Sequence, residues 1–142
     1  LQMSDSALPI SGYTHSWGLE AAIAQGLVDG PETLERWTSR WLRTSLAPLD
    51  GLLAVAACRA SGPAGIASLN EMAEASILPT SIRTASREMG GQLIELGETW
   101  SWSAAGLAPY AGMAGWHHSV AFGLLGSIAG ANADAVLTAY LH

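Results

Sequence analysis

Apolar residues recur every three or four positions along most of this chain, the spacing that places them on one face of an α-helix. One such pattern starts at Thr14 and passes through Trp17 to Leu27, and another starts at Pro31. Runs that alternate strictly between apolar and polar residues, as half-buried strands do, are few. The pattern therefore predicts an all-α fold, a compact bundle of about seven helices.

Proline, glycine and short polar residues predict where these helices begin and end. Asp29-Gly30-Pro31 is typical of a helix start, with proline at the first helical position. We expect that helix to end near Ala47-Pro48, because proline interrupts a helix. Ser68-Leu69-Asn70-Glu71 has the form of a capping box and predicts a further start. The predicted helices begin near Thr14, Pro31, Leu49, Ser68, Thr80, Ser119 and Asn132.

Glycines within two of these helices indicate close packing. Gly90 and Gly91 lie inside the predicted helix over 80–98, where each costs roughly 1 kcal/mol relative to alanine. We therefore expect another helix to cross there at short distance. Gly123, Gly126 and Gly130 predict a smooth face on the helix that begins near Ser119.

The composition indicates a single domain over 1–142 that presents an unusually apolar surface. Hydrophobic residues make up 49% of the 142 residues, charged residues make up 13%, and the mean hydropathy is +0.25. This favours a surface that a partner covers. Residues 99–133 carry no Asp, Glu, Lys or Arg, but Pro109, the pair His117-His118 and several glycines interrupt them. No transmembrane span is expected.

The charged residues and the cysteine exclude several function classes. A net charge of −6 argues against nucleic acid as a partner, which needs a basic surface. All six basic residues are arginines, so a Walker-type phosphate loop and Schiff-base chemistry are excluded. Cys58 is the only cysteine, which rules out an internal disulfide and predicts a cytoplasmic protein. We predict no cofactor.

Ser16, His15 and Glu20 have the side chains of a hydrolase site, but helical geometry separates them. Residues five apart on a helix diverge by about 140°, so His15 and Glu20 point apart. Ser16 and Glu20, four apart, would be neighbours that orient the helix end. We therefore predict no catalytic residues here.

His117-His118 is the other candidate for chemistry. Adjacent helical residues point about 100° apart, and the sequence has neither a second cysteine nor an HExxH motif, so no metal site is predicted. We expect one histidine to cap the helix that begins at Ser119 and the other to be packed or exposed. Arg83 and Arg87 can form a fork for a partner's carboxylate, and pairing with Glu88 or solvation is the alternative.

Three segments resemble those of a known family. Residues 8–20, with the sequence LPISGYTHSWGLE, resemble the N-terminal signature of the urease accessory protein UreF family. Arg87-Glu88-Met89-Gly90 and the segment 117–123, HHSVAFG, are similar to two later motifs of that family. Ser11, where the family has glycine, and Trp17, where a smaller or polar residue is common, depart from the signature.

The resemblance implies an all-helical, dimeric, non-enzymatic protein without a cofactor. It implies action with a UreD/UreH scaffold and the GTPase UreG to place nickel in the urease apoprotein. It also implies that this chain covers about two-thirds of a full member and lacks C-terminal helices. The partner-binding residues implied are Pro9, Gly12, Tyr13, His15, Ser16, Gly18, Glu20, Arg87 and His118.

Two alternatives stay open. The first is a non-enzymatic helical regulator of another oligomeric complex, in which the signature is a structural device. The second is a small hydrolase that uses His15 or His118.

Overall fold

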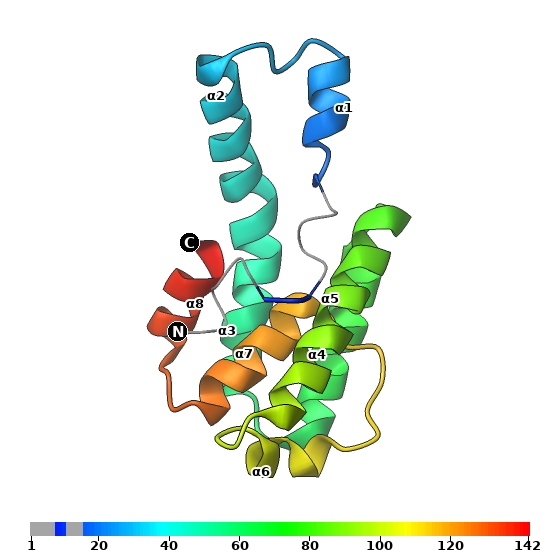
Figure 1. Ribbon diagram of the computed structural model, residues 1–142, viewed down its shortest axis with the longest axis vertical. Coiled ribbons are helices and arrows are strands. Elements are labelled where there is room, and N and C mark those ends of the chain that lie inside the picture. The colour runs from blue at the N-terminus through cyan, green and yellow to red at the C-terminus, as the bar shows by residue number, and fades with distance from the viewer. Residues whose placement is uncertain (1–7, 11–15) are drawn as a thin grey trace.

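Every regular element in the described part of the computed structural model, residues 8–10 and 16–142, is helical (Figure 1). Because α2, η3 and α3 run on without a break, the eight α-helical segments in this part form seven helices, and the all-α prediction is confirmed. The elements are α1 (Leu19–Ala24), α2 (Pro31–Trp41), the π-helical η3 (Leu42–Gly51), α3 (Leu52–Arg59), α4 (Gly62–Ser76), α5 (Thr80–Thr99), α6 (Ala104–Leu107), the 3-10 turn η4 (Ala108–Tyr110), α7 (His118–Ile128) and α8 (Ala133–Leu141).

The predicted break at Ala47-Pro48 is wrong. Pro48 lies inside η3, and the chain stays helical from Pro31 to Arg59. Proline cannot donate the backbone hydrogen bond of a regular α-helix. The wider π-helical winding accommodates the missing donor, so the helix changes its winding where the sequence indicated an end.

The predicted helix start at Ser68 is also wrong, because α4 begins at Gly62. Pro63 lies in its first turn, the position that tolerates proline. Ser68 instead lies inside the helix, and its hydroxyl donates to the carbonyl oxygen of Ala64 at 3.2 Å. The residues of a capping box occur here without the extended backbone that a cap requires.

The first helix begins later than predicted. Trp17 and Gly18 have φ angles of 52° and 92°, so helical backbone starts only at Leu19, while Thr14 lies outside the described residues. Ala22 is the buried residue of α1, and Ile23 and Leu27 are 54% and 63% exposed. The first predicted helix is therefore short, and two of its predicted apolar positions, Ile23 and Leu27, are exposed.

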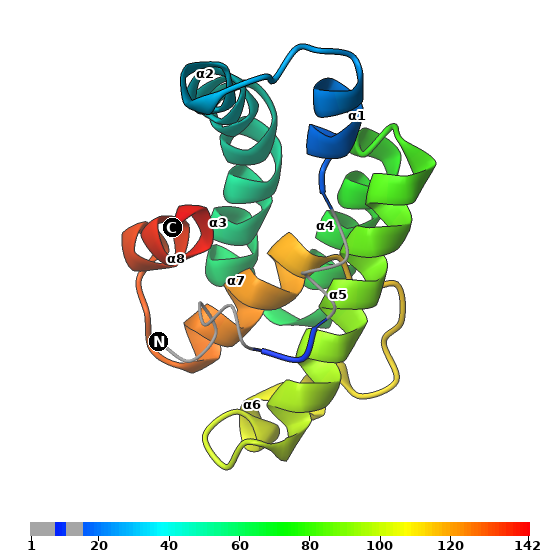
Figure 2. The ribbon, with the colours of Figure 1, turned by 45° about the horizontal axis from the view of Figure 1, so that its top comes forward.

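Helix α7 lies at the centre of the helical body, between α3 and α5, with α8 beside α3 (Figures 1 and 2). Its glycines allow close packing, as predicted. A Cβ on Gly123 would lie 2.8 Å from the Cβ of Ala57 on α3, and one on Gly126 would lie 2.6 Å from Val136 on α8. Gly130 has a different role, because its φ of 78° ends the helix.

Residues 16–41, which include α1 and α2, extend from this body as an N-terminal arm (Figure 1). Trp17 and Trp41 meet across the arm with their ring centroids 6.2 Å apart, and Trp37 stacks on Trp41 at 6.2 Å. Leu34 on α2 is 40% exposed. The arm therefore presents apolar side chains on both of its helices. Within the described residues, no helix has the length and apolar character needed to cross a bilayer.

Candidate functional site

Glu74 on α4 is the centre of a cluster that joins α4, α5 and the start of α7. Its carboxylate lies 3.3 Å from Nε of Arg83, 3.8 Å from a terminal nitrogen of Arg87, and 3.1 Å from Nε2 of His117. Arg83 also donates to the carbonyl oxygen of Ile77 at 3.0 Å, which fixes the chain between α4 and α5. The two arginines therefore converge on one carboxylate, as the predicted fork requires, and this carboxylate belongs to the chain's own α4 and not to Glu88.

His117 is fully buried, and its two ring nitrogens have different partners. Nδ1 lies 3.1 Å from the hydroxyl of Ser86, and Nε2 faces Glu74. Burial lowers the pKa of His117, while the hydrogen bond to Glu74 acts in the opposite direction. The neutral ring then donates from Nε2 to Glu74 and accepts at Nδ1 from Ser86, because this tautomer satisfies both partners. The Ser86 oxygen in turn accepts the backbone N–H of His118 at 3.3 Å.

The prediction that one histidine caps the helix that begins near Ser119, which is α7 in the structure, is wrong. His117 occupies the position before α7, but its side chain makes no cap bond and points to Ser86 and Glu74 instead. Its backbone N–H donates to Oδ1 of Asn70 at 2.8 Å. A capping side chain has to turn back toward the helix end, and the hydrogen bonds to α4 and α5 hold this ring elsewhere.

Ser86, His117 and Glu74 have the residue types of a nucleophile, a base and an orienting acid. Ser86 is only 2% exposed, lies inside α5, and already accepts a backbone hydrogen bond. Nucleophilic catalysis needs a hydroxyl that a substrate can reach. The arrangement therefore fits a structural link between helices. In the described residues, no group of three or more His, Cys, Asp or Glu side chains is placed to hold a metal ion.

Gly90 explains why the segment before α7 lies so close to α5. A Cβ at this position would lie 2.6 Å from the carbonyl carbon of His117 and 2.8 Å from the nitrogen of His118. The predicted close crossing is therefore present at Gly90, although an extended segment makes it in place of a helix. At Gly91 a Cβ would meet nothing within 4 Å.

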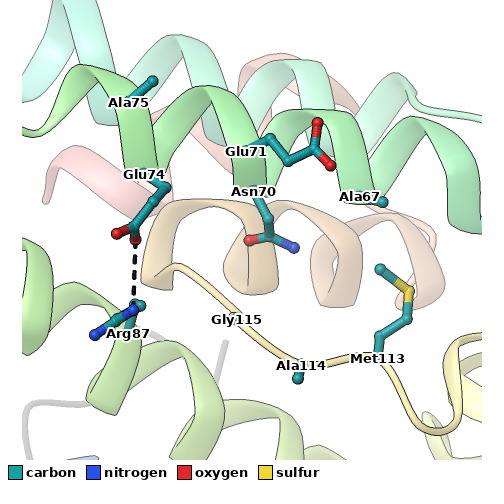
Figure 3. A pocket seen from close by; sticks show the side chains of 9 residues that line it. All are labelled: Ala67, Asn70, Glu71, Glu74, Ala75, Arg87, Met113, Ala114 and Gly115. Atoms are coloured by element: carbon teal, nitrogen blue, oxygen red, sulfur yellow. Dashed lines mark ion pairs between the residues drawn. The ribbon is translucent and has the colours of Figure 1, made fainter.

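A cavity of about 610 Å³ opens beside this cluster (Figure 3). Asn70, Glu71 and Glu74 of α4 line one side, and the loop over 113–115 lines the other, with Arg87 at one end. Nδ2 of Asn70 is buried and has no hydrogen-bond partner within the described residues. The cavity lining thus combines the Glu74–Arg87 ion pair with a further carboxylate, Glu71, and the buried amide nitrogen of Asn70.

His118 lies in a second, separate environment. Its Nδ1 lies 3.3 Å from the hydroxyl of Tyr140, and its ring contacts Phe122 and Tyr140 at centroid distances of 6.2 and 5.4 Å. Burial lowers the pKa of His118 to about 4, so the ring is neutral at neutral pH. Burial also raises the pKa of nearby Asp50. His118 therefore packs α8 against α7.

Of the N-terminal residues predicted as partner-binding, the structure describes Pro9, Ser16, Gly18 and Glu20, and none of these four forms an ion pair with Glu74. Glu20 is exposed on α1, and Ser16 precedes that helix, where its carbonyl oxygen accepts the N–H of Leu19 at 2.9 Å. The predicted pairing of Ser16 and Glu20 on one helical face is therefore wrong. Pro9 is exposed, and Gly18 forms the left-handed turn before α1. Gly12, Tyr13 and His15 lie outside the described residues.

Sequence reasoning did not identify Asn70, Glu74 and Ser86. They come from two helices and meet the 117–118 segment through contacts that span 31 to 47 residues. Local spacing carries no signal for such contacts. The available hint was the spacing of Ser86, which falls on the predicted apolar face of Ile82, Met89 and Leu93.

A profile of the UreF family matches residues 28–142 of this chain. The urease accessory protein UreF of Paenarthrobacter aurescens strain TC1 is 34% identical over 145 residues, which cover 99% of this chain and 63% of the relative. UreF of Mycobacterium sp. strain JLS is 37% identical over 136 residues, 92% of this chain and 59% of the relative. UreF of Azotobacter vinelandii strain DJ is 38% identical over 99 residues, which cover 68% of this chain and 44% of the relative.

The chain therefore spans less than two-thirds of the length of these curated relatives. No solved structure matches it.

Proposed function

Because this chain belongs to the UreF family, we propose that it is a non-enzymatic accessory protein of urease maturation. The observation that carries the proposal is the family match, which covers residues 28–142. In this role the chain acts in the cytoplasm, as a homodimer, with a UreD/UreH scaffold and the GTPase UreG. The complex then assists nickel insertion into the urease apoprotein.

The geometry of the Glu74 cluster supports a non-catalytic role. Two of the segments that carry the family resemblance, around Arg87 and His117, meet there. The buried His117 ring and the half-exposed Arg87 side chain both contact Glu74, so α4, α5 and the start of α7 are held together. A scaffold of fixed helices suits a protein that presents surfaces to others.

The N-terminal arm supports partner binding. Ile23, Leu27 and Leu34 are 54%, 63% and 40% exposed, so both of its helices leave large apolar side chains in water. Exposed apolar side chains of this kind mark surfaces that a partner covers when they lie close together. Glu20 is exposed on the same arm, and we propose that it contributes to the contact with UreG.

The test is size-exclusion chromatography with light scattering, on this chain mixed with UreD/UreH and UreG, with nickel and a GTP analogue. We expect a complex that elutes as one species and that Glu20→Ala weakens. Glu32→Ala is the matched control, since Glu32 is also an exposed glutamate in the first turn of a helix. A chain that keeps its helical circular dichroism spectrum and elutes alone would contradict the proposal. If Glu20→Ala unfolds the chain, Glu20 is structural and this part of the assignment is wrong.

A further inference from the structure

Two cavities adjoin on the face formed by α4, α5 and the loop over 113–116. The first is the cavity of about 610 Å³ described above, and the second has a volume of about 440 Å³. Both are lined by Arg87 and by residues 113–115, so they meet along the loop. The first cavity lies on the α4 side of the loop and the second on the α5 side, and we call the two together the loop groove.

Asn70 contributes a buried hydrogen-bond donor to the loop groove. The residue is 6% exposed, and its Oδ1 is occupied by the backbone N–H of His117. That bond fixes the orientation of the amide, so Nδ2 faces the cavity and not His117 (Figure 3). Nδ2 has no partner within the described residues. Buried donors are almost always paired, so this one indicates an acceptor that an occupant of the groove supplies.

The charges that line the loop groove are predominantly acidic. Glu71 lines the first cavity, and Glu95 and Glu98 line the second; all three are exposed. No ion pair between described residues involves any of these three carboxylates. Arg87 is the one basic residue among the lining residues, and its guanidinium lies 3.8 Å from Glu74. The unbalanced charge of the groove is therefore negative.

We propose that the loop groove binds an extended, basic segment of a partner protein. A backbone carbonyl oxygen of that segment accepts a hydrogen bond from Nδ2 of Asn70. Its arginine or lysine side chains pair with Glu71 on the α4 side of the loop and with Glu95 or Glu98 on the α5 side. The inference rests on the proposed function, because it names the kind of segment that a partner in the assembly contributes.

The chemistry favours a polypeptide over other occupants. Successive carbonyl oxygens of an extended chain point to opposite sides, so one side presents a carbonyl oxygen roughly every 7 Å, which suits a single fixed amide donor with acidic groups on either side. Basic side chains carry methylene groups that pack on apolar lining such as Met113 and Ala67. A nucleic acid backbone would be repelled by the glutamates.

The first experiment titrates a ¹⁵N-labelled sample of this chain with the peptide acetyl-Gly-Arg-Gly-Arg-Gly-amide, observed by NMR. The reference peptide has citrulline in place of both arginines, which keeps the shape and removes the charge. We expect the arginine peptide to bind with a dissociation constant on the order of 1 mM, and the citrulline peptide to bind at least fivefold more weakly. Equal binding of the two peptides, or no binding of either, would overturn the proposal.

The second readout locates the peptide. The side-chain amide signals of Asn70 are expected to shift on binding, because Nδ2 acquires an acceptor. Those of Asn132 are the internal control, since Asn132 caps α8 by accepting the N–H of Ala135 at 2.8 Å and lies outside the groove. Binding that shifts Asn132 and leaves Asn70 unchanged would overturn the proposed position.

Charge-neutral variants test the acidic groups on the two sides of the loop. The double change Glu71→Gln and Glu95→Gln should weaken the arginine peptide at least fivefold without altering the fold. Glu88→Gln is the matched control, because Glu88 is an exposed glutamate on α5 that lines neither cavity. If Glu88→Gln weakens binding as much as the double change, the effect is general charge and the proposal fails.

The same variants in the accessory-protein mixture separate this inference from the proposed function. If the unaltered chain forms no complex with UreD/UreH and UreG, the proposed function fails, whatever the peptide does. If the complex forms and the double change leaves it intact, the function stands and the loop groove is not the contact. We expect the complex to weaken with the double change and to persist with Glu88→Gln.

Discussion

Gly90 and Gly91 are adjacent residues on α5 with opposite surroundings. The backbone of residues 116–118 lies against Gly90, whereas the space beside Gly91 is open. A helical glycine is unfavourable because the unfolded chain has more freedom to lose. At Gly90 the close approach of the backbone offsets that cost, and at Gly91 nothing in the packing does.

We therefore expect the two alanine substitutions to have opposite signs. Gly90→Ala forces the new methyl against backbone that cannot rotate away, and should lower the free energy of unfolding by roughly 1–3 kcal/mol or more. Gly91→Ala should raise it by about 0.5–1 kcal/mol through helix propensity. Urea unfolding followed by circular dichroism measures both. Equal effects at the two positions would show that the 116–118 segment does not lie against Gly90.

His118 makes the stability of the chain depend on pH. Its pKa falls from 6.5 in the unfolded chain to about 4 in the fold, so the unfolded state binds the proton more readily between these values. The contribution of His118 is complete above pH 6.5 and is lost as the pH falls toward 4, a loss of roughly 3 kcal/mol. The lowered pKa of His117 acts in the same direction, and the raised pKa of Asp50 acts against both.

The variant His118→Phe isolates this contribution, because phenylalanine keeps a ring against Phe122 and Tyr140 and cannot titrate. We expect unfolding free energies of the unaltered chain to fall more steeply between pH 6.5 and 4 than those of the variant. The comparison uses urea unfolding at several pH values. Parallel pH profiles would mean that the His118 ring is hydrated in the fold.

The long helix from Pro31 to Arg59 continues through Pro48, although proline normally interrupts a helix. Pro48 is exposed and lies in the π-helical η3. At Gly51, the last residue of η3, an added Cβ would lie 3.0 Å from the side chain of Leu137 on α8, so η3 packs closely on α8. Packing of η3 and α3 on α7 and α8 supplies the favourable energy, and the wider winding removes the clash at the proline. Tertiary contacts therefore override the local signal.

Pro48→Ala tests this account of the helix. A proline inside a helix costs about 3 kcal/mol relative to alanine, and the π-helical winding reduces that cost without removing it. We expect the alanine variant to unfold at higher urea concentration, with helical circular dichroism unchanged or slightly greater. Lower stability would mean that the π-helical winding itself is required to seat η3 on α8.

The sequence predicted the elements better than the contacts between them. Periodicity located α5 and α7 correctly, and the glycines of α7 predicted its close packing, because both signals are local. The start of α4 was misplaced at Ser68, since a capping motif and an interior serine have the same letters. The Glu74 cluster was not predicted, because His117 is separated in the sequence by 43 residues from Glu74 and by 31 residues from Ser86.

At the scale of the whole molecule, stability should be unequally distributed between the helical body and the N-terminal arm. Helix α7 buries eight of its eleven residues among α3, α5 and α8. Helix α2 buries none, and α1 buries only Ala22. Local opening requires least free energy where few apolar contacts are lost.

Native-state hydrogen exchange should show this difference directly. We expect backbone amides of α7 to exchange only through global unfolding, and those of α1 and the first turns of α2 to exchange through local opening that denaturant hardly accelerates. Adding UreD/UreH and UreG should then slow exchange in the arm, because a partner that covers Ile23, Leu27 and Leu34 must be released before the arm opens. Slower exchange in the body with an unchanged arm would mean that the partners bind the helical body, which carries the loop groove, and not the arm.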